Sequence, residues 1–476
     1  MTDVDRTIRQ ASYMTETEAL MWAAESDPWL SSAMGSVFVL DTAPDFDRFV
    51  ATLERASHTL LRLRERVEDG SGIAPPQWVI DDEFDISDHV RHVKLSGKGG
   101  MRELLDLAVQ VFQDPFDRNK PLWQFVAVEG PGRKTKSSIR GGVIMKLHHS
   151  VSDGIGALRL AEMYLDFERN PKVDDEPVAP VPLGEGPSRG LVEAVVADVD
   201  YVVRQQLEMG RRAVAEFVMW GADPDRARSA LSKIGGIAKA ASGSMTGGFD
   251  AGSGSSLWRE RSRHRHLEVF DVPLDDLKAS SKRLGGSIND LFVAGSVLAA
   301  ARYHAERHAS VHAFNLSFII STRTDDAAGG NSFAPVPLSI PGAEMSAIET
   351  FELVRDTIAL KRQAMGSTSD DLMELVSGFV TMLPDSMVSR AGRARSARQD
   401  WATSNLRGAP IPIFVAGGEI THMYPVGPLA GTAFNLTAMS YTGTLHFGLH
   451  VDPTAVDDPS VLARHLADAY ADLTSA

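Results

Sequence analysis

Two polar stretches interrupt the middle of the chain and limit how it can fold more than any other feature. Residues 171–190 combine Pro, Gly and acidic side chains, which is typical of a linker. Residues 241–256 are rich in Gly and Ser. The chain has 476 residues, which is too long for one ordinary hydrophobic core. We therefore expect two folded parts, one on each side of the interruption.

Short strand-type runs and helical periodicities alternate on both sides of this interruption. Apolar runs bounded by turn residues favour strands, and apolar residues three or four apart favour helices. Strands are expected at residues 37–40, 77–80, 124–128, 142–147, 266–272, 314–320, 435–441 and 444–451, and helices at 15–24, 46–53, 155–164 and from 287. This mixture predicts an α/β sandwich in which helices cover a sheet.

The expected boundaries follow from this pattern. Residues 1–180 form the first half, 181–258 a connecting segment, and 259–476 the second half. Within the connecting segment, residues 191–220 have helical spacing, with arginines beside an apolar stripe. Such a helix either lies on a membrane surface or packs between the two halves.

Composition narrows the classes of function. The chain contains no cysteine, which excludes disulfides, thiolate metal sites and cysteine nucleophiles and suits a reducing cytoplasm. Its formal net charge of -15 does not favour nucleic acid as a partner. The acidic N-terminus does not resemble a signal peptide. Since no run of about 18 apolar residues occurs, we expect a cytoplasmic protein whose membrane contact, if any, is peripheral.

Residues 148–154, His-His-Ser-Val-Ser-Asp-Gly, are the strongest candidate for chemistry. The expected strand ends at His148 and His149, and Asp153 and Gly154 begin the next helix. Many α/β proteins place reacting groups where a strand leads into a helix. An imidazole, whose ordinary pKa is ~6.5, is suited to accepting a proton near neutral pH.

Two other interpretations of this motif remain open at the level of these seven residues. One is a zinc site, but neighbouring residues on an extended chain point to opposite faces, and no third strong ligand follows at a standard spacing. We therefore expect no metal. The other is a purely structural histidine at the end of a strand, with an aspartate that caps a helix.

The remaining blocks carry a resemblance to a known family. The pattern His-His-x-x-x-Asp-Gly resembles the signature of the CoA-dependent acyltransferase superfamily, which includes chloramphenicol acetyltransferase and condensation domains. Nearly the whole chain resembles bacterial wax ester synthase/diacylglycerol acyltransferases. The matching blocks are residues 114–123, 148–154, 287–290, 404–408 and 423–428, with the closing hairpin.

This resemblance implies an architecture and a reaction. Two chloramphenicol acetyltransferase-like α/β sandwich halves would enclose a tunnel. The second histidine, His149, would be the general base, and Asp153 would be held by an arginine of the second half, for which Arg323 is the candidate. The substrates would be acyl-CoA and either a long-chain alcohol or diacylglycerol, without a cofactor. The partner surface would be the inner membrane face or a lipid inclusion.

Several further residues have a functional and a structural interpretation. Asn289 either donates to the developing oxyanion, or supports His149, or caps its helix together with Ser287. Ser404 and Asn405 either line the tunnel or form a plain turn beside Gly408. Three consecutive apolar residues also have two interpretations, namely Pro121, Leu122 and Trp123. The family resemblance implies that they form a wall of the acyl channel, whereas their sequence alone favours ordinary positions in the hydrophobic core.

Departures from the family pattern leave open which lipid alcohol accepts the acyl group. Residues 14–19 and 319–323 differ from the usual blocks, and Arg407 and Ala409 replace prolines. None of these changes touches His149. Two alternatives from other classes remain, namely a non-catalytic lipid or CoA carrier and a metal-dependent hydrolase. Within the acyltransferases, the alternative is a condensation-type enzyme that uses a carrier-bound donor or a different acceptor.

Overall fold

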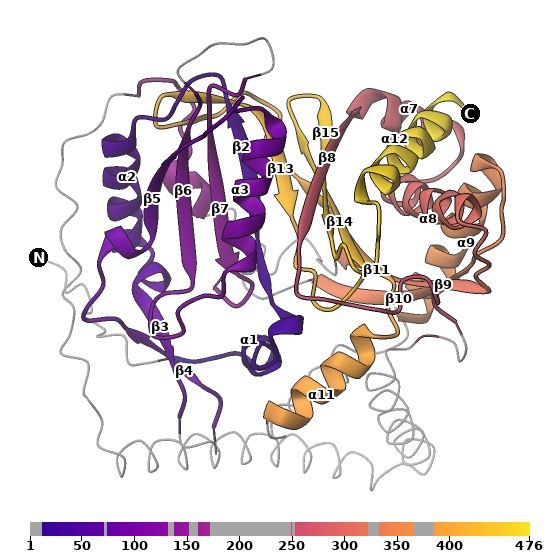
Figure 1. Cartoon of the computed structure of the whole chain (residues 1–476), viewed down its shortest axis with the longest axis horizontal. Helices are drawn as coiled ribbons and strands as arrows, with labels where there is room; N and C mark the ends of the chain where they lie inside the picture. Colours follow the sequence, from indigo (N-terminus) through magenta and orange to yellow (C-terminus); the bar gives the residue numbers. More distant parts are fainter. Residues whose placement is uncertain are drawn as a thin grey trace, which may run out of the picture.

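Two six-stranded sheets with their covering helices build the molecule (Figure 1). The computed structural model describes residues 12–70, 74–131, 138–151, 160–171, 249, 253–321, 333–365 and 385–476. Its helices are α1 (Glu16–Ala24), α2 (Phe46–Thr59), α3 (Met101–Gln113), α7 (Leu274–Arg283), α8 (Ile288–Glu306), α9 (Ala347–Met365), α11 (Asp385–Ser396) and α12 (Pro459–Ser475). Three short 3-10 helices are η1 (Pro28–Leu30), η2 (Leu61–Arg64) and η3 (Ile86–Asp88).

The first sheet lies between α2 and α3. Its strand order is β12 (Phe414–Val415), β13 (Gly418–Val426), β2 (Ala33–Leu40), β7 (Gly141–His148), β6 (Trp123–Glu129) and β5 (Val90–Lys94). Every neighbouring pair is antiparallel except β5 and β6. One core joins α2 to this sheet through Phe49, Leu53 and Val143, and a second core lies on the α3 side. A sheet covered on both faces explains why β7 is almost continuously buried.

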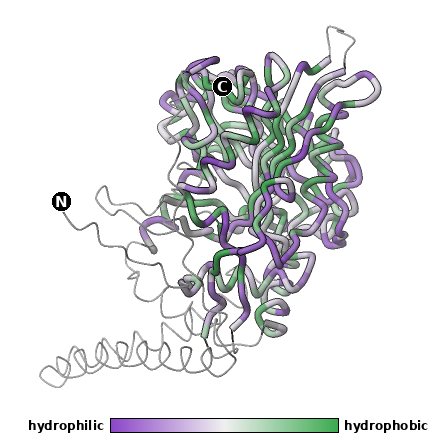
Figure 2. Tube along the Cα trace, turned by 90° about the vertical axis from the view of Figure 1, so that its left-hand side faces the viewer, coloured by the Kyte–Doolittle hydropathy of each residue, from purple (hydrophilic) through white to green (hydrophobic). Residues whose placement is uncertain are grey.

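The second sheet carries its helices on one face. Its strand order is β10 (Phe333–Pro341), β9 (Ala313–Ser321), β11 (Trp401–Arg407), β14 (Phe434–Tyr441), β15 (Thr444–Val451) and β8 (His266–Pro273). The largest core packs this face against α7, α8, α9 and α12. Helix α8 is buried on nearly all sides, as expected for a central helix. In Figure 2, hydrophobic segments run through the interior strands, with hydrophilic ones at the periphery.

The second half of the chain supplies part of the first sheet. Strand β13 follows β11 in sequence but pairs antiparallel with β2, with Val426 opposite Gly35 and Met423 opposite Phe38. Where β13 meets β15, a Cβ built on Gly448 would lie 1.7 Å from the carbonyl oxygen of Pro425. Only glycine permits such a close approach. The two halves are therefore interlocked, and the predicted range 259–476 contributes to both sheets.

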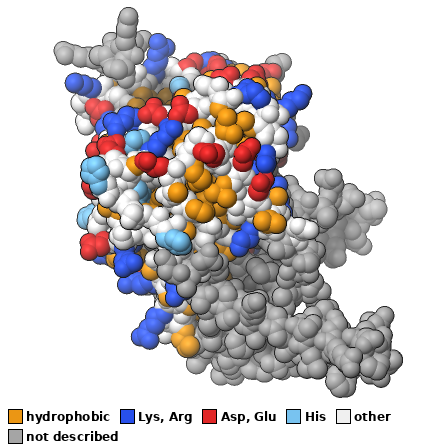
Figure 3. All heavy atoms as spheres, turned by 90° about the vertical axis from the view of Figure 1, so that its right-hand side faces the viewer, with side chains coloured by type: hydrophobic (Ala, Val, Ile, Leu, Met, Phe, Trp, Pro, Cys, Tyr) orange, Lys and Arg blue, Asp and Glu red, His pale blue; other side chains and the backbone are white. Residues whose placement is uncertain are grey.

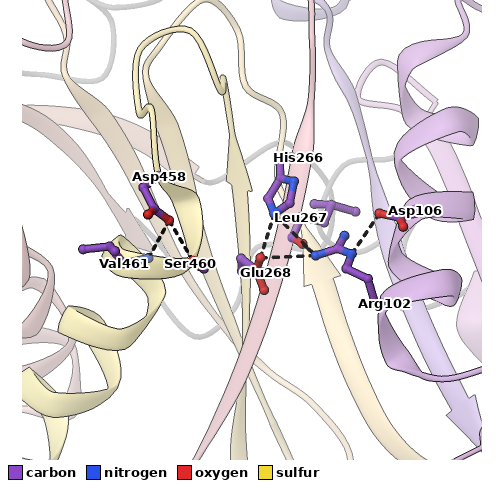
Figure 4. A network of polar contacts seen from close by, with 8 residues as sticks. All are labelled: Arg102, Asp106, His266, Leu267, Glu268, Asp458, Ser460 and Val461. Carbon is purple, nitrogen blue, oxygen red and sulfur yellow. Dashed lines mark hydrogen bonds and ion pairs between the residues drawn. The ribbon is translucent and has the colours of Figure 1, made fainter.

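A polar network joins the halves on the side of α3 (Figure 4). Arg102 of α3 donates to the carbonyl of Leu267 at 3.0 Å and to Glu268 Oε1 at 3.2 Å. His266 lies 2.7 Å from the same Glu268 oxygen, so the β8 edge offers Arg102 a preformed acceptor group. Since these side chains are partly exposed, each pair adds little stability on its own, but together they fix how α3 lies against β8.

A small third sheet sets the position of α1. It comprises β1 (Ser12–Tyr13), β4 (Gln77–Ile80) and β3 (Glu65–Glu68). Thr15 and Glu18 form the capping box that the sequence resembles, with Thr15 as the N-cap. Trp22 of α1 is buried against Trp78, and its ring nitrogen donates to Asp69 at 2.8 Å. These contacts fix α1 against the small third sheet.

Most expected strands and helices are confirmed within a few residues. The closing hairpin turns at Thr442 and Gly443, which both have positive φ, as expected for a tight turn. The expected 155–164 helix is described from residue 160 onward. The 171–190 linker beyond residue 171, the 191–220 helix and residues 241–248 lie outside the described residues.

Among the described residues, no single helix has both the length and the apolar composition of a membrane span. The bent pair α7 and α8 passes on length and composition, but α8 is buried in the core. Figure 3 shows acidic, basic and apolar side chains interspersed on the right-hand face of Figure 1.

Candidate active site

Strand β7 places the histidine pair at the end of the first sheet. His148 is its last residue and pairs with Ala33 of β2. The backbone N–H of His148 donates to the carbonyl of Leu122 at 3.0 Å, and that of His149 to the carbonyl of Ser32 at 3.1 Å. Both neighbouring segments thus hold the backbone of the pair, and the predicted position at a strand end is confirmed.

The ring of His148 is fully enclosed and has polar partners at both nitrogens. The backbone N–H and the hydroxyl of Ser150 face Nδ1 at 3.1 Å and 2.6 Å. Nε2 contacts the carboxylate of Glu25, the residue that caps the C-terminus of α1. Trp22 and Phe116 lie edge-on to the ring. His148 has no exposed surface, so its evident role is internal support, and the predicted catalytic role stays a prediction.

Glu25 stays charged beside this ring. Burial alone would raise its pKa, but the hydrogen bond and charge of His148, with smaller contributions from Ser31 and Ser32, hold the pKa below its ordinary value. No local pattern in the sequence identifies this residue, because it precedes His148 by more than a hundred positions. It is a part of the site that the sequence alone did not predict.

His149 differs from its neighbour in being partly exposed. Its Nδ1 is buried without a hydrogen bond to any described residue. Burial lowers the pKa of His149, its own backbone carbonyl partly offsets this, and the neighbouring His148 lowers it further. The ring is thus neutral at neutral pH, which is the state that a general base needs.

Lys146 adds a buried cation two residues before His148. It is 1% exposed, donates to the carbonyl of Asp114 at 2.5 Å and lies over the ring of Phe116 at 4.1 Å. Burial lowers its pKa to about 8, although the charges of Asp114 and Glu25 oppose the shift. From the sequence alone, this lysine is expected only as part of the 142–147 strand.

The predicted channel residues lie in packed core. Pro121, Leu122 and Trp123 are all buried. Trp123 stacks on His89 with ring centroids 4.4 Å apart and donates to the carbonyl of Leu63 at 2.7 Å. The carbonyl of Leu122 supports His148. These residues thus have an evident structural role, and their role as a wall of the acyl channel stays a prediction.

Asn289 lies in the first turn of α8 but does not cap it. Ser287 is the N-cap, and its partner in the capping box is Asp290, so the capping interpretation of Asn289 is wrong. Its Nδ2 is buried without a hydrogen bond to any described residue. An unpaired buried amide is unfavourable in the free protein, which keeps a substrate-facing role open. No described contact joins it to His149.

Ser404 and Asn405 are strand residues, so the interpretation as a plain turn is wrong. They lie in β11, opposite Thr437 and Ala438 of the parallel strand β14. Both are partly exposed. Gly408 follows the strand, where a Cβ would lie 2.3 Å from the carbonyl oxygen of Ser440, so its role is to permit close packing. Lining a tunnel stays a prediction for the first two.

Three predicted residues, Asp153, Gly154 and Arg323, lie outside the described residues. Within the described part of the chain, no three His, Asp or Glu side chains are grouped so that they could hold a metal ion. Two open surface pockets of about 370 Å³ and 310 Å³ lie beside α11 and α9, and neither is lined by a residue of the histidine motif. The tunnel itself therefore stays a prediction.

Comparison with known proteins covers almost the whole chain. Residues 14–292 match the model of the wax ester synthase/diacylglycerol acyltransferase catalytic domain, and residues 329–474 match the C-terminal domain of the same group. A putative diacylglycerol O-acyltransferase of Mycobacterium tuberculosis is 29% identical over 97% of this chain and 91% of its own length. A probable diacylglycerol O-acyltransferase of the same organism is 23% identical, covering 98% of this chain and 96% of its own.

Solved structures share the fold. A wax ester synthase/diacylglycerol acyltransferase from Marinobacter aquaeolei VT8 has a TM-score of 0.62 at 18% identity, covering 97% of this chain and 98% of its own. The first condensation domain of the calcium-dependent antibiotic synthetase has a TM-score of 0.58 at 17% identity, covering 98% and 96%. The expected architecture of two chloramphenicol acetyltransferase-like halves is thereby confirmed.

Proposed function

The chain belongs to the wax ester synthase/diacylglycerol acyltransferase family, and we propose that it moves a fatty acyl group from acyl-CoA to a lipid hydroxyl with His149 as the general base. The observation that carries this assignment is the contrast between two adjacent rings. His148 is fully buried and its Nε2 contacts the carboxylate of Glu25, whereas His149 is partly exposed and burial lowers its pKa.

The proposed reaction is a direct transfer in a ternary complex. Nε2 of His149 takes the proton of the acceptor hydroxyl while that oxygen attacks the thioester carbonyl carbon. The C–S bond of the resulting tetrahedral intermediate then breaks, and the proton passes from Nε2 to the sulfur of CoA. The products are an ester and free CoA, and the reaction as written uses no cofactor. Holding both substrates together supplies much of the rate through orientation.

Donors for the negative oxygen of the intermediate must come from the protein. Asn289 is the proposed donor, because its amide nitrogen is buried and has no hydrogen-bond partner among the described residues. Asp153 and Arg323 are proposed as a structural ion pair that shapes the loop after the histidines. Ser404 and Asn405, with Pro121, Leu122 and Trp123, are proposed to line the passage that excludes water.

The acceptor is proposed to be diacylglycerol or a long-chain alcohol. The two relatives from Mycobacterium tuberculosis have names that specify diacylglycerol, which makes it the first acceptor to test. Because both acceptors are lipids, we propose that the protein works at the inner membrane face or on lipid inclusions, bound peripherally.

Labelled palmitoyl-CoA offered with either diacylglycerol or hexadecanol tests the proposal. The wild-type protein is expected to form triacylglycerol, wax ester or both, and His149→Ala is expected to lose about 10²–10⁴-fold in ester formation. The matched control is His92→Ala, because His92 is an exposed histidine on β5 of the same sheet. Unchanged ester yield in His149→Ala removes the general-base assignment, and no ester with either acceptor removes the substrate assignment.

A further inference from the structure

We propose that Glu25 is a positioning residue for the reaction, because its carboxylate holds both the ring of His148 and the backbone segment that supports His149. The inference rests on the proposed function, since it concerns the geometry of the same base. Glu25 lies at the end of α1, far in sequence from the motif. The comparisons with known proteins assign it no role.

One carboxylate makes two separate contacts. Its Oε2 faces Nε2 of His148, and its Oε1 accepts the backbone N–H of Ser32 at 3.3 Å. The carbonyl of the same Ser32 accepts the backbone N–H of His149 at 3.1 Å. Glu25 therefore connects to His149 by two routes, through the neighbouring ring and through the peptide that holds its backbone.

The hydrogen-bond pattern at His148 requires an acceptor at the position of Glu25. The backbone N–H of Ser150 donates to Nδ1 at 3.1 Å, so this nitrogen carries no proton. The ring proton then resides on Nε2. Because the residue is 0% exposed, solvent does not supply a partner for that proton. The carboxylate of Glu25 is the polar group in contact with Nε2, and this contact holds the ring in its orientation.

The surroundings of Glu25 favour a carboxylate over a neutral group. The buried ammonium of Lys146 lies close enough to interact with its charge. An amide in the same place has one acceptor oxygen and an NH₂ group that donates. It would either lose the Ser32 contact or present a donor to Nε2, which would force the His148 proton onto Nδ1, against the N–H of Ser150.

Glu25 acts through other residues and does not touch a substrate. Among the described residues, its carboxylate contacts His148, Ser31 and Ser32 and does not contact the ring of His149. Loss of the carboxylate should therefore displace the base without removing a substrate contact. Since a displacement of about 1 Å can lower a rate by about 100-fold, kcat should fall while KM stays the same.

The test compares Glu25→Gln with Asp27→Asn in the full-length protein. Asp27 is a matched control because it lies two residues further on and pairs with Arg393, away from both histidines. We expect Glu25→Gln to lower kcat by about 10- to 100-fold, with KM changed by less than about twofold. Asp27→Asn should retain wild-type kcat. Histidine-selective ¹⁵N NMR should show protonated Nε2 at His148 in the wild type and in Asp27→Asn, and its loss in Glu25→Gln.

Two further variants separate the possible outcomes. If Glu25→Gln does not fold, Glu25→Asp keeps the charge but withdraws it by about one bond length, ~1.5 Å, and should still lower kcat at constant KM. A wild-type kcat in whichever of these variants folds, alongside an inactive His149→Ala, overturns the positioning role and leaves the proposed function intact. Full activity of His149→Ala overturns the proposed function instead.

Discussion

Two buried serine–histidine pairs among the described residues have different surroundings. In the first pair, beside the first sheet, Ser150 Oγ lies 2.6 Å from Nδ1 of His148. In the second pair, Ser255 Oγ lies 2.7 Å from Nε2 of His304 in α8. The distances and the burial are almost the same. The pairs differ in what meets the opposite nitrogen, which is the carboxylate of Glu25 at His148 and the backbone carbonyl of Ala300 at His304.

This difference shows that a serine–histidine contact does not by itself indicate catalysis. His304 lies inside the core of the second half, with its Nδ1 proton used by its own helix. Burial lowers its pKa to about 4, with a further decrease from Arg307, so it stays neutral and structural. His148 is equally buried, but the residue after it is accessible. The proposed site thus differs from the second pair in having a carboxylate against the buried ring and a partly exposed histidine next to it.

Replacing each buried histidine by phenylalanine should separate the pairs most strongly. His148→Phe leaves the Glu25 carboxylate buried without its partner, which should destabilise the protein by about 3 kcal/mol and lower kcat by about 100-fold. His304→Phe removes two neutral hydrogen bonds and should cost about 1–3 kcal/mol, with unchanged kcat for the folded protein. Urea unfolding and steady-state kinetics check both. Equal kcat values in the two variants would contradict the contrast between the pairs.

The two pairs should also lose their contributions to the stability of the protein in different pH ranges. The folded-state pKa of His304, about 4, lies below its ordinary 6.5, so the unfolded chain binds the proton first as pH falls. Stability should be complete above pH 6.5 and decrease towards pH 4, by roughly 3 kcal/mol for this residue. Glu25 has a folded-state pKa below its ordinary 4.5, so its contribution is complete above 4.5 and is lost only as pH falls through that lower value.

Urea unfolding of wild type and His304→Phe across this range is the measurement. Their stability difference should change between pH 6.5 and 4 and then stay level. A difference that stays constant over that interval would mean that His304 is not the titrating group.

Removing the serine hydroxyls should give the smallest effect. Ser255→Ala deprives His304 of its partner and the backbone N–H of Trp258 of its acceptor, and should cost about 1–3 kcal/mol. In Ser150→Ala the backbone N–H still reaches Nδ1 of His148, so the expected loss is about 0.5–1.5 kcal/mol. Thermal unfolding of both variants checks this order, and a larger loss in Ser150→Ala would reverse it.

Much of the fold follows from local patterns. The strands at 77–80 and 444–451 have the expected bounds, and the capping box at Thr15 and the turn at Thr442 are confirmed. These features depend on side-chain alternation and on short-range hydrogen bonds, which the sequence shows directly. The family followed from several ordered motif blocks, of which the histidine pair is one.

Other features were not accessible from the sequence. Strand β13 has an ordinary strand pattern, but nothing local indicates that it pairs with β2 of the other half. Asn289 resembled a capping residue because Asn is common at N-caps, yet Ser287 and Asp290 cap the helix. Ser404 and Asn405 resembled turn residues, whereas the ladder with β14 makes them part of a strand.

The sequence by itself determined the family, and with it acyl transfer as the kind of reaction, because several ordered motif blocks along the chain match that family. Only the tertiary structure decided that His148 is fully buried while His149 is partly exposed, and that Glu25 contacts His148 and interacts with the charge of Lys146. The physical reason is that burial and charge depend on residues brought together from distant parts of the chain. They set the pKa and the tautomer of an imidazole, and no spacing along the sequence encodes them.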